Sequence, residues 1–252
     1  MPFTFSHPAL ILPFQKIGKR YVSFTGLVMG SMIPDFEFFF KMRTGPNIGH
    51  HFPGAFFLNI PLALILCFIF HEFVKRPLFY NVPFFLKARL VKYVSFNWYQ
   101  YAIKNTFVIV SSITLGIGTH LFWDAFTHDD GFFVERIRFL SVQMSFFNYT
   151  FPMYAILQVI FSIVGLIAVG SCIWKMPKIK RLVPQRGNST YWALIGALSV
   201  SFFVIRSLLL SNYTTFWDNF MGLMGSLIYA IISVSILQYF KYLGRNGARD
   251  KS

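Results

Sequence analysis

Long apolar blocks separated by short polar connections dominate this chain. Four blocks meet or approach the roughly 20 residues that an α-helix needs to cross a hydrocarbon core, and they are residues 105–123, 151–174, 187–205 and 219–240. Two further blocks are weaker: residues 21–40 contain Asp35 and Glu37 near their end, and residues 55–70 are short and contain Pro61. The pattern predicts an all-α, polytopic transmembrane helix bundle of about six spans.

The composition agrees with a membrane-embedded chain. Of 252 residues, 55% are hydrophobic and 13% are charged, about half the charged fraction of a soluble domain. Backbone polar groups in lipid have to be paired within the spanning segment, which makes helices the default. The opening MPFTFSHPALILPF has no basic leader, so we expect no cleavable signal peptide and a first span that acts as the insertion signal. Cys67 and Cys172 lie in apolar blocks and are expected to be small core residues, not a disulfide.

The cations alternate from one connection to the next. The net charge is +14, and the cations gather in the N-terminal segment, in residues 74–105, in residues 175–186 and in the C-terminal tail, including Lys16, Lys19, Arg20, Lys75, Arg76, Lys87, Arg89, Lys92, Lys104, Lys175, Lys178, Lys180, Arg181, Arg186, Lys241, Arg245, Arg249 and Lys251. The other connections carry far fewer cations. By the positive-inside rule, this distribution predicts that both termini are cytoplasmic. No nucleic-acid-binding motif accompanies the charge, so we expect no nucleic-acid partner.

Ionisable side chains are concentrated in the first part of the chain. The histidines and most of the acids lie within the first 135 residues, and Arg206 is the main exception in the last three predicted spans. We therefore expect residues 1–150 to carry a metal site and residues 151–252 to form an apolar three-span part of the same bundle. A lone Arg facing acyl chains is costly, so Arg206 is expected to face the bundle or the outer headgroups.

The segment GTHLFWDAFTHDDG, residues 118–131, carries the most informative spacing. His120, Asp124 and His128 follow one another at intervals of four residues, which places them on one face of an α-helix. Imidazole nitrogens and a carboxylate on adjacent turns can bind one divalent cation, with zinc, iron and manganese all suited to these ligands. The alternative is a hydrogen-bonded structural network inside the bundle.

Two other segments offer further ligands. In SMIPDFEF, Asp35 and Glu37 point to nearly opposite sides of a regular helix, and we choose Asp35 as the one that faces a common site. The alternative for this Pro-Asp pair is helix capping or turn chemistry. In the turn GHHFPG, His50 and His51 could both bind a metal, or one could bind while the other contacts substrate, or both could be solvated.

The predicted topology brings these three segments to the outer membrane face. That convergence favours a metal site over unrelated polar residues. His71 falls at the opposite, cytoplasmic end of the second span and is expected to be an interface or helix-end residue. His7 precedes the first span and would be cytoplasmic, unless residues 8–20 fold back or the first span is shorter than drawn.

The same residues resemble a bacterial membrane family, the domain of unknown function 4184 family. The resemblance is carried over roughly the first 150 residues by MPFTFSHPA, GSMIPDFEFF, the His50 turn, FHEFVKRPL and THLFWDAFTHDDG. The order of histidines and aspartates is also distantly similar to membrane-bound metal-dependent hydrolases and to zinc-dependent phospholipase C-like proteins. That likeness implies a bacterial cytoplasmic (inner) membrane location and a ligand set of His7, Asp35, His50, His120, Asp124 and His128. His7 enters this set by the likeness alone, and His51 stands where the family has a small hydroxyl residue.

These observations predict a membrane-embedded metal-dependent hydrolase. One or two divalent ions, zinc first and manganese or iron otherwise, would lower the pKa of bound water and polarise a phosphoryl oxygen. Asp35 or Asp124 could then act as a catalytic base and not as a ligand. The expected partners are membrane lipid and an amphiphilic or phosphoester substrate at the outer face. A transporter or proton-handling protein and an accessory protein with a structural His/Asp network are the alternatives.

Overall fold

The computed structural model describes residues 2–147, 149–179 and 189–249. Its internal contacts divide the chain into two compact units. The first unit comprises Met1–Asp35, Ile48–Leu64 and Asn105–Lys175. The second unit comprises Phe36–Asn47, Ile65–Lys104 and Met176–Ser252. Each unit is therefore assembled from three segments that are distant in the sequence.

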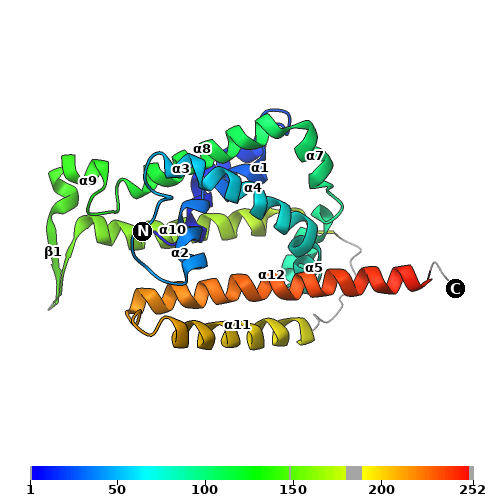
Figure 1. Cartoon of the computed structure of the whole chain (residues 1–252). Coiled ribbons are helices and arrows are strands. Elements are labelled where there is room, and N and C mark those ends of the chain that lie inside the picture. The colour runs from blue at the N-terminus through cyan, green and yellow to red at the C-terminus, as the bar shows by residue number, and fades with distance from the viewer. Residues whose placement is uncertain (1, 148, 180–188, 250–252) are drawn as a thin grey trace. The chain divides into compact units, whose positions relative to one another are not determined.

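The first unit holds two long helices and several short elements (Figure 1). Its elements are the 3₁₀ helix η1 (Thr4–Lys16), α1 (Phe24–Gly30), α3 (Gly54–Phe57), α8 (Thr106–Asp124), α9 (Phe132–Arg136), the 3₁₀ turn η4 (Arg138–Ser141), the strands β1 (Gln143–Phe146) and β2 (Tyr149–Pro152), and α10 (Met153–Lys175). Two more helices, α2 (Ile33–Lys41) and α4 (Asn59–Ile69), begin in this unit and continue into the other.

The second unit is built around a pair of long helices that lie side by side, α11 (Ser189–Leu209) and α12 (Phe216–Arg249) (Figure 1). Tyr191 and Ile195 of α11 pack against Ala230 and Val234 of α12 in a fully buried cluster. The remaining elements are the π-helical turn η2 (Phe70–Val74), α5 (Lys75–Asn81), α6 (Phe84–Leu90), the 3₁₀ turn η3 (Val91–Tyr93) and α7 (Trp98–Lys104).

The structure confirms the all-α polytopic class. Among the described residues, five helical stretches are long and apolar enough to cross a membrane: Gly54–Asn81, Thr106–Asp124, Met153–Lys175, Ser189–Leu209 and Phe216–Lys241. These correspond to the last five of the predicted spans. The stretch Gly54–Asn81 is longer than the predicted span of residues 55–70, because the helix continues beyond residue 70 through the π-helical turn η2 into α5. The chain is thus an α-helical membrane protein.

The first predicted span, residues 21–40, is not one long helix. The chain forms α1, turns at Ser31 and Met32, and restarts as α2 with Pro34 in its first turn. Proline has no backbone N–H to donate, so it is tolerated in a first turn but interrupts a helix that continues through it. The interruption places Asp35 at the start of a new helix and not near the end of a long one.

Close helix packing positions α8 against α1. Gly116 faces the backbone of α1, and a Cβ built there would lie 2.5 Å from the carbonyl oxygen of Leu27 and 2.8 Å from the nitrogen of Ser31. Gly30 faces the backbone of Ile113 in the same way. Only glycine permits two backbones to approach this closely, so the pair fixes the height of α8 relative to Ser31.

The N-terminal segment folds back along the first unit. The η1 helix packs against α10, α8 and α1, and a Cβ added to Gly165 of α10 would lie 2.7 Å from the side chain of Ser6. His7, on this segment, is completely buried. His7 was expected to be far from the other ligands unless residues 8–20 folded back or the first span was shorter than predicted. In the structure the first span is two short helices, α1 and α2, and the segment that carries His7 packs beside α8.

Some predictions fall outside the described residues. The start of the fifth predicted span at Gly187 and the cations Lys180, Arg181, Arg186 and Lys251 lie there. The orientation of the termini stays a prediction, as does the division of the chain's chemistry at residue 150. Arg206, by contrast, is 3% exposed and donates hydrogen bonds to neighbouring backbone groups of its unit, which confirms that it faces the bundle.

Candidate metal centre

Four side chains from three separate segments meet inside the first unit. Asp35 lies in the first turn of α2, His50 in the turn before α3, and His120 and Asp124 on the last turns of α8. One ligand atom from each residue lies within 4.8 Å of the other three. We call these four residues the His/Asp cluster. Asp35 and His120 are completely buried, Asp124 is 5% exposed, and His50 is half-buried.

The spacing of the four ligand atoms matches a single coordinated cation. The five separations recorded among Asp35 Oδ1, His50 Nε2, His120 Nε2 and Asp124 Oδ2 run from 3.1 to 3.6 Å. Zinc bound tetrahedrally at its usual nitrogen and oxygen distances would hold its ligand atoms ~3.3–3.4 Å apart. Nε2 of His50 and Nε2 of His120 are 3.2 Å apart, although the two residues are distant in the sequence. These four atoms could therefore hold one metal ion.

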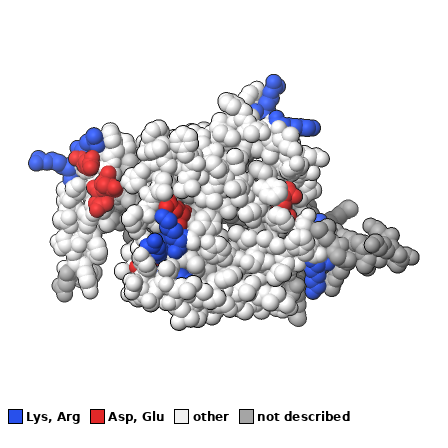
Figure 2. Space-filling view, viewed as in Figure 1, with Lys and Arg blue, Asp and Glu red and all other residues white. Residues whose placement is uncertain are grey.

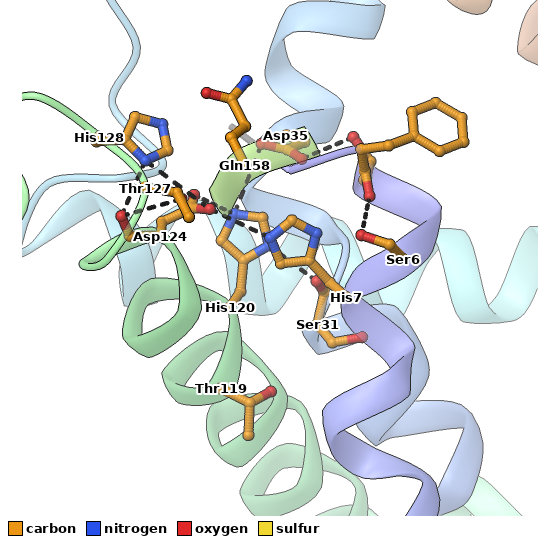
Figure 3. Close-up of polar contacts among 12 residues, drawn as sticks. Ser6, His7, Ser31, Asp35, Thr119, His120, Asp124, Thr127, His128 and Gln158 are labelled. Atoms are coloured by element: carbon orange, nitrogen blue, oxygen red, sulfur yellow. Dashed lines mark hydrogen bonds and ion pairs between the residues drawn. The ribbon is translucent and has the colours of Figure 1, made fainter. Parts of the chain in front are cut away.

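A backbone carbonyl sets the orientation of His120. Its Nδ1 lies 2.8 Å from the carbonyl oxygen of Ser31, the residue that follows α1 (Figure 3). A carbonyl oxygen only accepts, so Nδ1 carries the proton, and the Nε2 of a neutral imidazole presents its lone pair to the cluster. Such a bond to the remote ring nitrogen is the usual way in which a metal-binding histidine is oriented.

The two carboxylates each use one oxygen for the protein and leave one for the cluster. Asp35 Oδ2 accepts a 2.6 Å hydrogen bond from the hydroxyl of Thr4, and Asp124 Oδ1 lies 3.2 Å from Nε2 of His7. The other oxygens, Asp35 Oδ1 and Asp124 Oδ2, are buried and accept no hydrogen bond of regular geometry. Each of these oxygens lies 3.1–3.6 Å from the Nε2 atoms of His50 and His120. Its buried charge can therefore be balanced by protonated imidazoles or by a bound cation.

His50 lies where the cluster approaches the protein surface. Its side chain is 15% exposed, whereas those of Asp35 and His120 are fully buried. Burial lowers the pKa of His50, but the neighbouring carboxylates of Asp124 and Asp35 outweigh it and raise that pKa to about 9. A protonated His50 and a divalent cation would both balance the carboxylate charge, so they compete for the same position.

Two further predicted ligands lie beside the cluster and not within it. His7 stacks on His120 with ring centroids 4.0 Å apart while it contacts Asp124. His128 follows the end of α8, so the expected third turn on the same helical face does not form. Its Nδ1 lies 3.1 Å from the carbonyl oxygen of Asp124 and 3.9 Å from Asp124 Oδ1. Both histidines therefore lie beside Asp124 Oδ1, the carboxylate oxygen that faces away from the cluster.

The other histidines and the second acid of α2 lie elsewhere. His51 is exposed. Glu37, in the second unit, pairs with Lys41 on the next turn of α2, so Asp35 is the residue of that pair that joins the cluster. His71 is also in the second unit, where it stacks on Trp98.

Sequence reasoning missed the residues that hold the cluster in place. Thr4 and Ser31 lie in the segments MPFTFSHPA and GSMIPDFEFF, and neither has a spacing that links it to Asp35 or His120. The serine acts through its backbone, which any residue could supply. The threonine acts through η1, whose fold-back does not follow from its hydrophobic pattern.

The chain belongs to the family described as Domain of unknown function (DUF4184), whose model matches residues 1–236. The match extends well beyond the 150 residues in which the resemblance was recognised and takes in the last predicted spans. No curated protein and no solved structure matches the chain.

Proposed function

We propose that this chain is a membrane-embedded, metal-dependent hydrolase whose metal is held by the His/Asp cluster. The observation that carries the proposal is a compact set of four ligand atoms, three of them from buried residues and one from half-buried His50, with five recorded separations of 3.1–3.6 Å. Two imidazoles and two carboxylates suit zinc, manganese or iron. When bound, such an ion lowers the pKa of water and polarises a phosphoryl or carbonyl oxygen.

The number of ligands makes the identity of the metal informative. Four protein ligands fill tetrahedral zinc, and closed sites of this kind are usually structural, whereas a catalytic site keeps an open position. A six-coordinate ion such as manganese or iron(II) would keep two positions open with the same ligands. Hydrolysis by this cluster therefore requires either a six-coordinate ion or the release of one carboxylate, Asp35 or Asp124, to act as the base.

The surrounding residues support a site that has an accessible side. His50 and His128 are the partly exposed members, with side chains 15% and 26% exposed, whereas Asp35, His120 and His7 are closed off. Near His50 in the chain, Phe52 and Phe57 are 82% and 80% exposed. Such a surface suits an amphiphilic phosphoester, because imidazoles can contact its polar head and exposed aromatic rings can contact its hydrocarbon part. We place the site at the outer face of a bacterial inner membrane.

A structural metal site is the second candidate, because four protein ligands are enough to fill the tetrahedral coordination of zinc. In that case the cluster would bind zinc, and the protein would be an accessory membrane protein. The two candidates share the metal and differ in turnover.

Metal analysis followed by an activity assay tests the proposal. Protein purified in detergent should contain a divalent metal in stoichiometric amount, and metal-loaded protein should hydrolyse a chromogenic phosphodiester or a phospholipid in mixed micelles. His50→Ala should remove both metal and turnover, and the adjacent His51→Ala should remove neither. Stoichiometric zinc without turnover on either substrate would favour the structural site. Metal-free protein that stays metal-free after incubation with zinc, manganese and iron(II) would overturn the proposal.

A further inference from the structure

The connection between α8 and α10 carries an antiparallel hairpin that the apolar pattern did not predict. Strands β1 and β2 pair Gln143 with Pro152 and Met144 with Phe151. The pairing continues to Ser145 and Thr150. Directly opposed residues share a face, and faces alternate along each strand. Met144, Tyr149 and Phe151 therefore lie on one face, whereas Gln143, Ser145 and Thr150 lie on the other.

The aromatic face of the hairpin is not covered by its own unit. Tyr149 is 70% exposed, Phe151 is 46% exposed, and Phe147 at the tip is completely exposed. The preceding segment adds Phe139 and Val142, which are 60% and 44% exposed. A soluble protein seldom exposes a contiguous apolar patch of this kind, and such patches mark surfaces that meet lipid or another protein.

Charge favours lipid. From Phe139 to Trp174 the chain has no Lys, Arg, Asp or Glu, and this stretch contains both the hairpin and almost all of α10. In Figure 2 the charged side chains of this region gather over α9, and the hairpin below them shows none. A protein partner usually meets a polar rim around an apolar patch, whereas a lipid interface tolerates an uncharged aromatic surface.

The connection to α10 fixes the depth. The base of the hairpin is closed by a 2.9 Å bond from the nitrogen of Met153 to the carbonyl oxygen of Val142, and Met153 is also the first residue of α10. The 23 residues of α10 extend ~35 Å, which is enough for a hydrocarbon core of about 30 Å without the hairpin. The outer edges of a two-stranded sheet leave backbone groups unpaired, and these are excluded from the hydrocarbon.

We infer that the hairpin Gln143–Pro152 lies in the lipid interface, with the face bearing Tyr149 and Phe151 against the acyl chains and the face bearing Thr150 toward water. Aromatic side chains are favoured at this depth. A lone hairpin is marginally stable in water, so the lipid surface is also what stabilises it. Because α8 ends at Asp124 and α10 begins at Met153, the hairpin anchors the membrane face at which the His/Asp cluster lies. The inference depends on the two spans and not on any metal.

Fluorescent labelling in lipid vesicles tests this placement. In a chain with Cys67→Ala and Cys172→Ala, an environment-sensitive NBD label is attached to single cysteines introduced by Phe147→Cys, Tyr149→Cys, Ser145→Cys or Thr150→Cys. The protein is reconstituted into phosphatidylcholine–phosphatidylglycerol vesicles. Emission is measured with lipids that carry a shallow nitroxide quencher and, separately, with aqueous iodide on protein reconstituted so that this face is outside.

The expected result is a difference between faces. Labels at 147 and 149 should show blue-shifted emission, strong quenching by the nitroxide lipid and protection from iodide, and labels at 145 and 150 should show the reverse. Equal iodide quenching at all four positions would overturn the inference. Protection from iodide without quenching by the lipid would also overturn it, because the aromatic face would then be covered by protein. All four positions are exposed, and monodisperse elution before reconstitution confirms that each labelled chain is folded.

Discussion

Two buried polar centres, one in each unit, differ in how completely their groups are paired. In the second unit, Arg206 donates to the carbonyl oxygens of Met42, Tyr213 and Asp218 and to the side chain of Asn219, all at 2.9–3.1 Å. In the first unit, the His/Asp cluster leaves Asp35 Oδ1 and Asp124 Oδ2 without a regular hydrogen bond. Both centres are buried, so burial alone does not distinguish them.

The carboxylate beside Arg206 shows the same contrast more directly. Asp218 Oδ1 accepts bonds from the nitrogen and hydroxyl of Thr44, and Oδ2 accepts bonds from the nitrogen and hydroxyl of Thr215. Each oxygen is satisfied by donors from the protein itself. A network in which every acceptor has a hydrogen-bond donor stabilises the fold, whereas convergent acceptors without regular hydrogen bonds could hold a cation. The difference favours a structural role for the centre at Arg206 and is compatible with the metal binding that we propose for the cluster.

The largest expected effect is loss of the metal from the cluster. His120→Ala and Asp124→Ala should each abolish stoichiometric metal, because each removes one of about four ligands. His71→Ala should leave the metal in place, since His71 stacks on Trp98 in the second unit and is not one of the four. Metal content is measured by mass spectrometry on variants that elute as monodisperse protein. Full metal retention in both α8 variants would show that the cluster is a hydrogen-bonded network like that of Arg206.

The next effect concerns the free energy of unfolding, which should depend more on the centre at Arg206 than on the His/Asp cluster. Arg206→Met removes four hydrogen bonds from a charged group and leaves buried carbonyls unpaired, which should lower the free energy of unfolding by roughly 3–5 kcal/mol. Stoichiometric metal should persist at temperatures where the variant is folded. Asp35→Asn in metal-free protein should cost less stability than Arg206→Met, because Oδ1 accepts no hydrogen bond of regular geometry and loses only its ion pairs with His50 and His120 at 3.4 and 3.5 Å.

Denaturant titration in detergent measures both variants. A large loss of stability in metal-free Asp35→Asn would mean that the cluster is held by its own contacts, and the contrast with Arg206 would fail.

A smaller effect is expected where helix packing positions a ligand. A methyl group at residue 116 would meet the backbone of Leu27 and Ser31, and the Ser31 carbonyl orients His120. Gly116→Ala should therefore weaken metal affinity roughly 10–100-fold, as other changes to ligand-orienting groups do, without changing the number of ions bound at saturation. Gly118→Ala is the matched control, because nothing lies within 4 Å of a Cβ at that position. Competition with a chelator of known affinity measures the metal affinity of each variant. Equal affinities of the two variants would show that the packing of α8 against α1 does not orient His120.

The sequence predicted the part of the site that one helix determines. His120 and Asp124 share a face of α8 because helical periodicity requires it, and the limits of the long spans followed from hydrophobic length alone. The sequence placed Asp35 and His50 near His120 and Asp124 only through an assumed membrane topology. The structure brings the four residues together, although the first predicted span is two short helices.

Other features depend on contacts that no local pattern encodes. The fold-back of η1, with Pro8 and Pro13 inside it, has no hydrophobic period and is held in place by packing against α10 and α8. The β-hairpin lies in an uncharged aromatic stretch that resembles the beginning of a span, so periodicity could not separate it from α10. His128 was expected on the same helical face as His120 and Asp124, but α8 ends at Asp124, close to the predicted limit of the apolar block, so the helical spacing does not extend to it.

The smallest expected effect tests whether the N-terminal segment positions the cluster. The hydroxyl of Thr4 is the donor to Asp35 Oδ2, and Thr4 is 3% exposed. Thr4→Val keeps the shape of the side chain and removes that donor, which should lower metal affinity about 10-fold and stability by only ~1 kcal/mol. Thr4→Ser keeps the hydroxyl and should retain most of the affinity. If valine and serine weaken binding equally, packing of η1 and not the hydrogen bond positions Asp35. If neither changes affinity, the carboxylate is held by α2 alone, and the cluster is less dependent on long-range contacts than the network around Arg206.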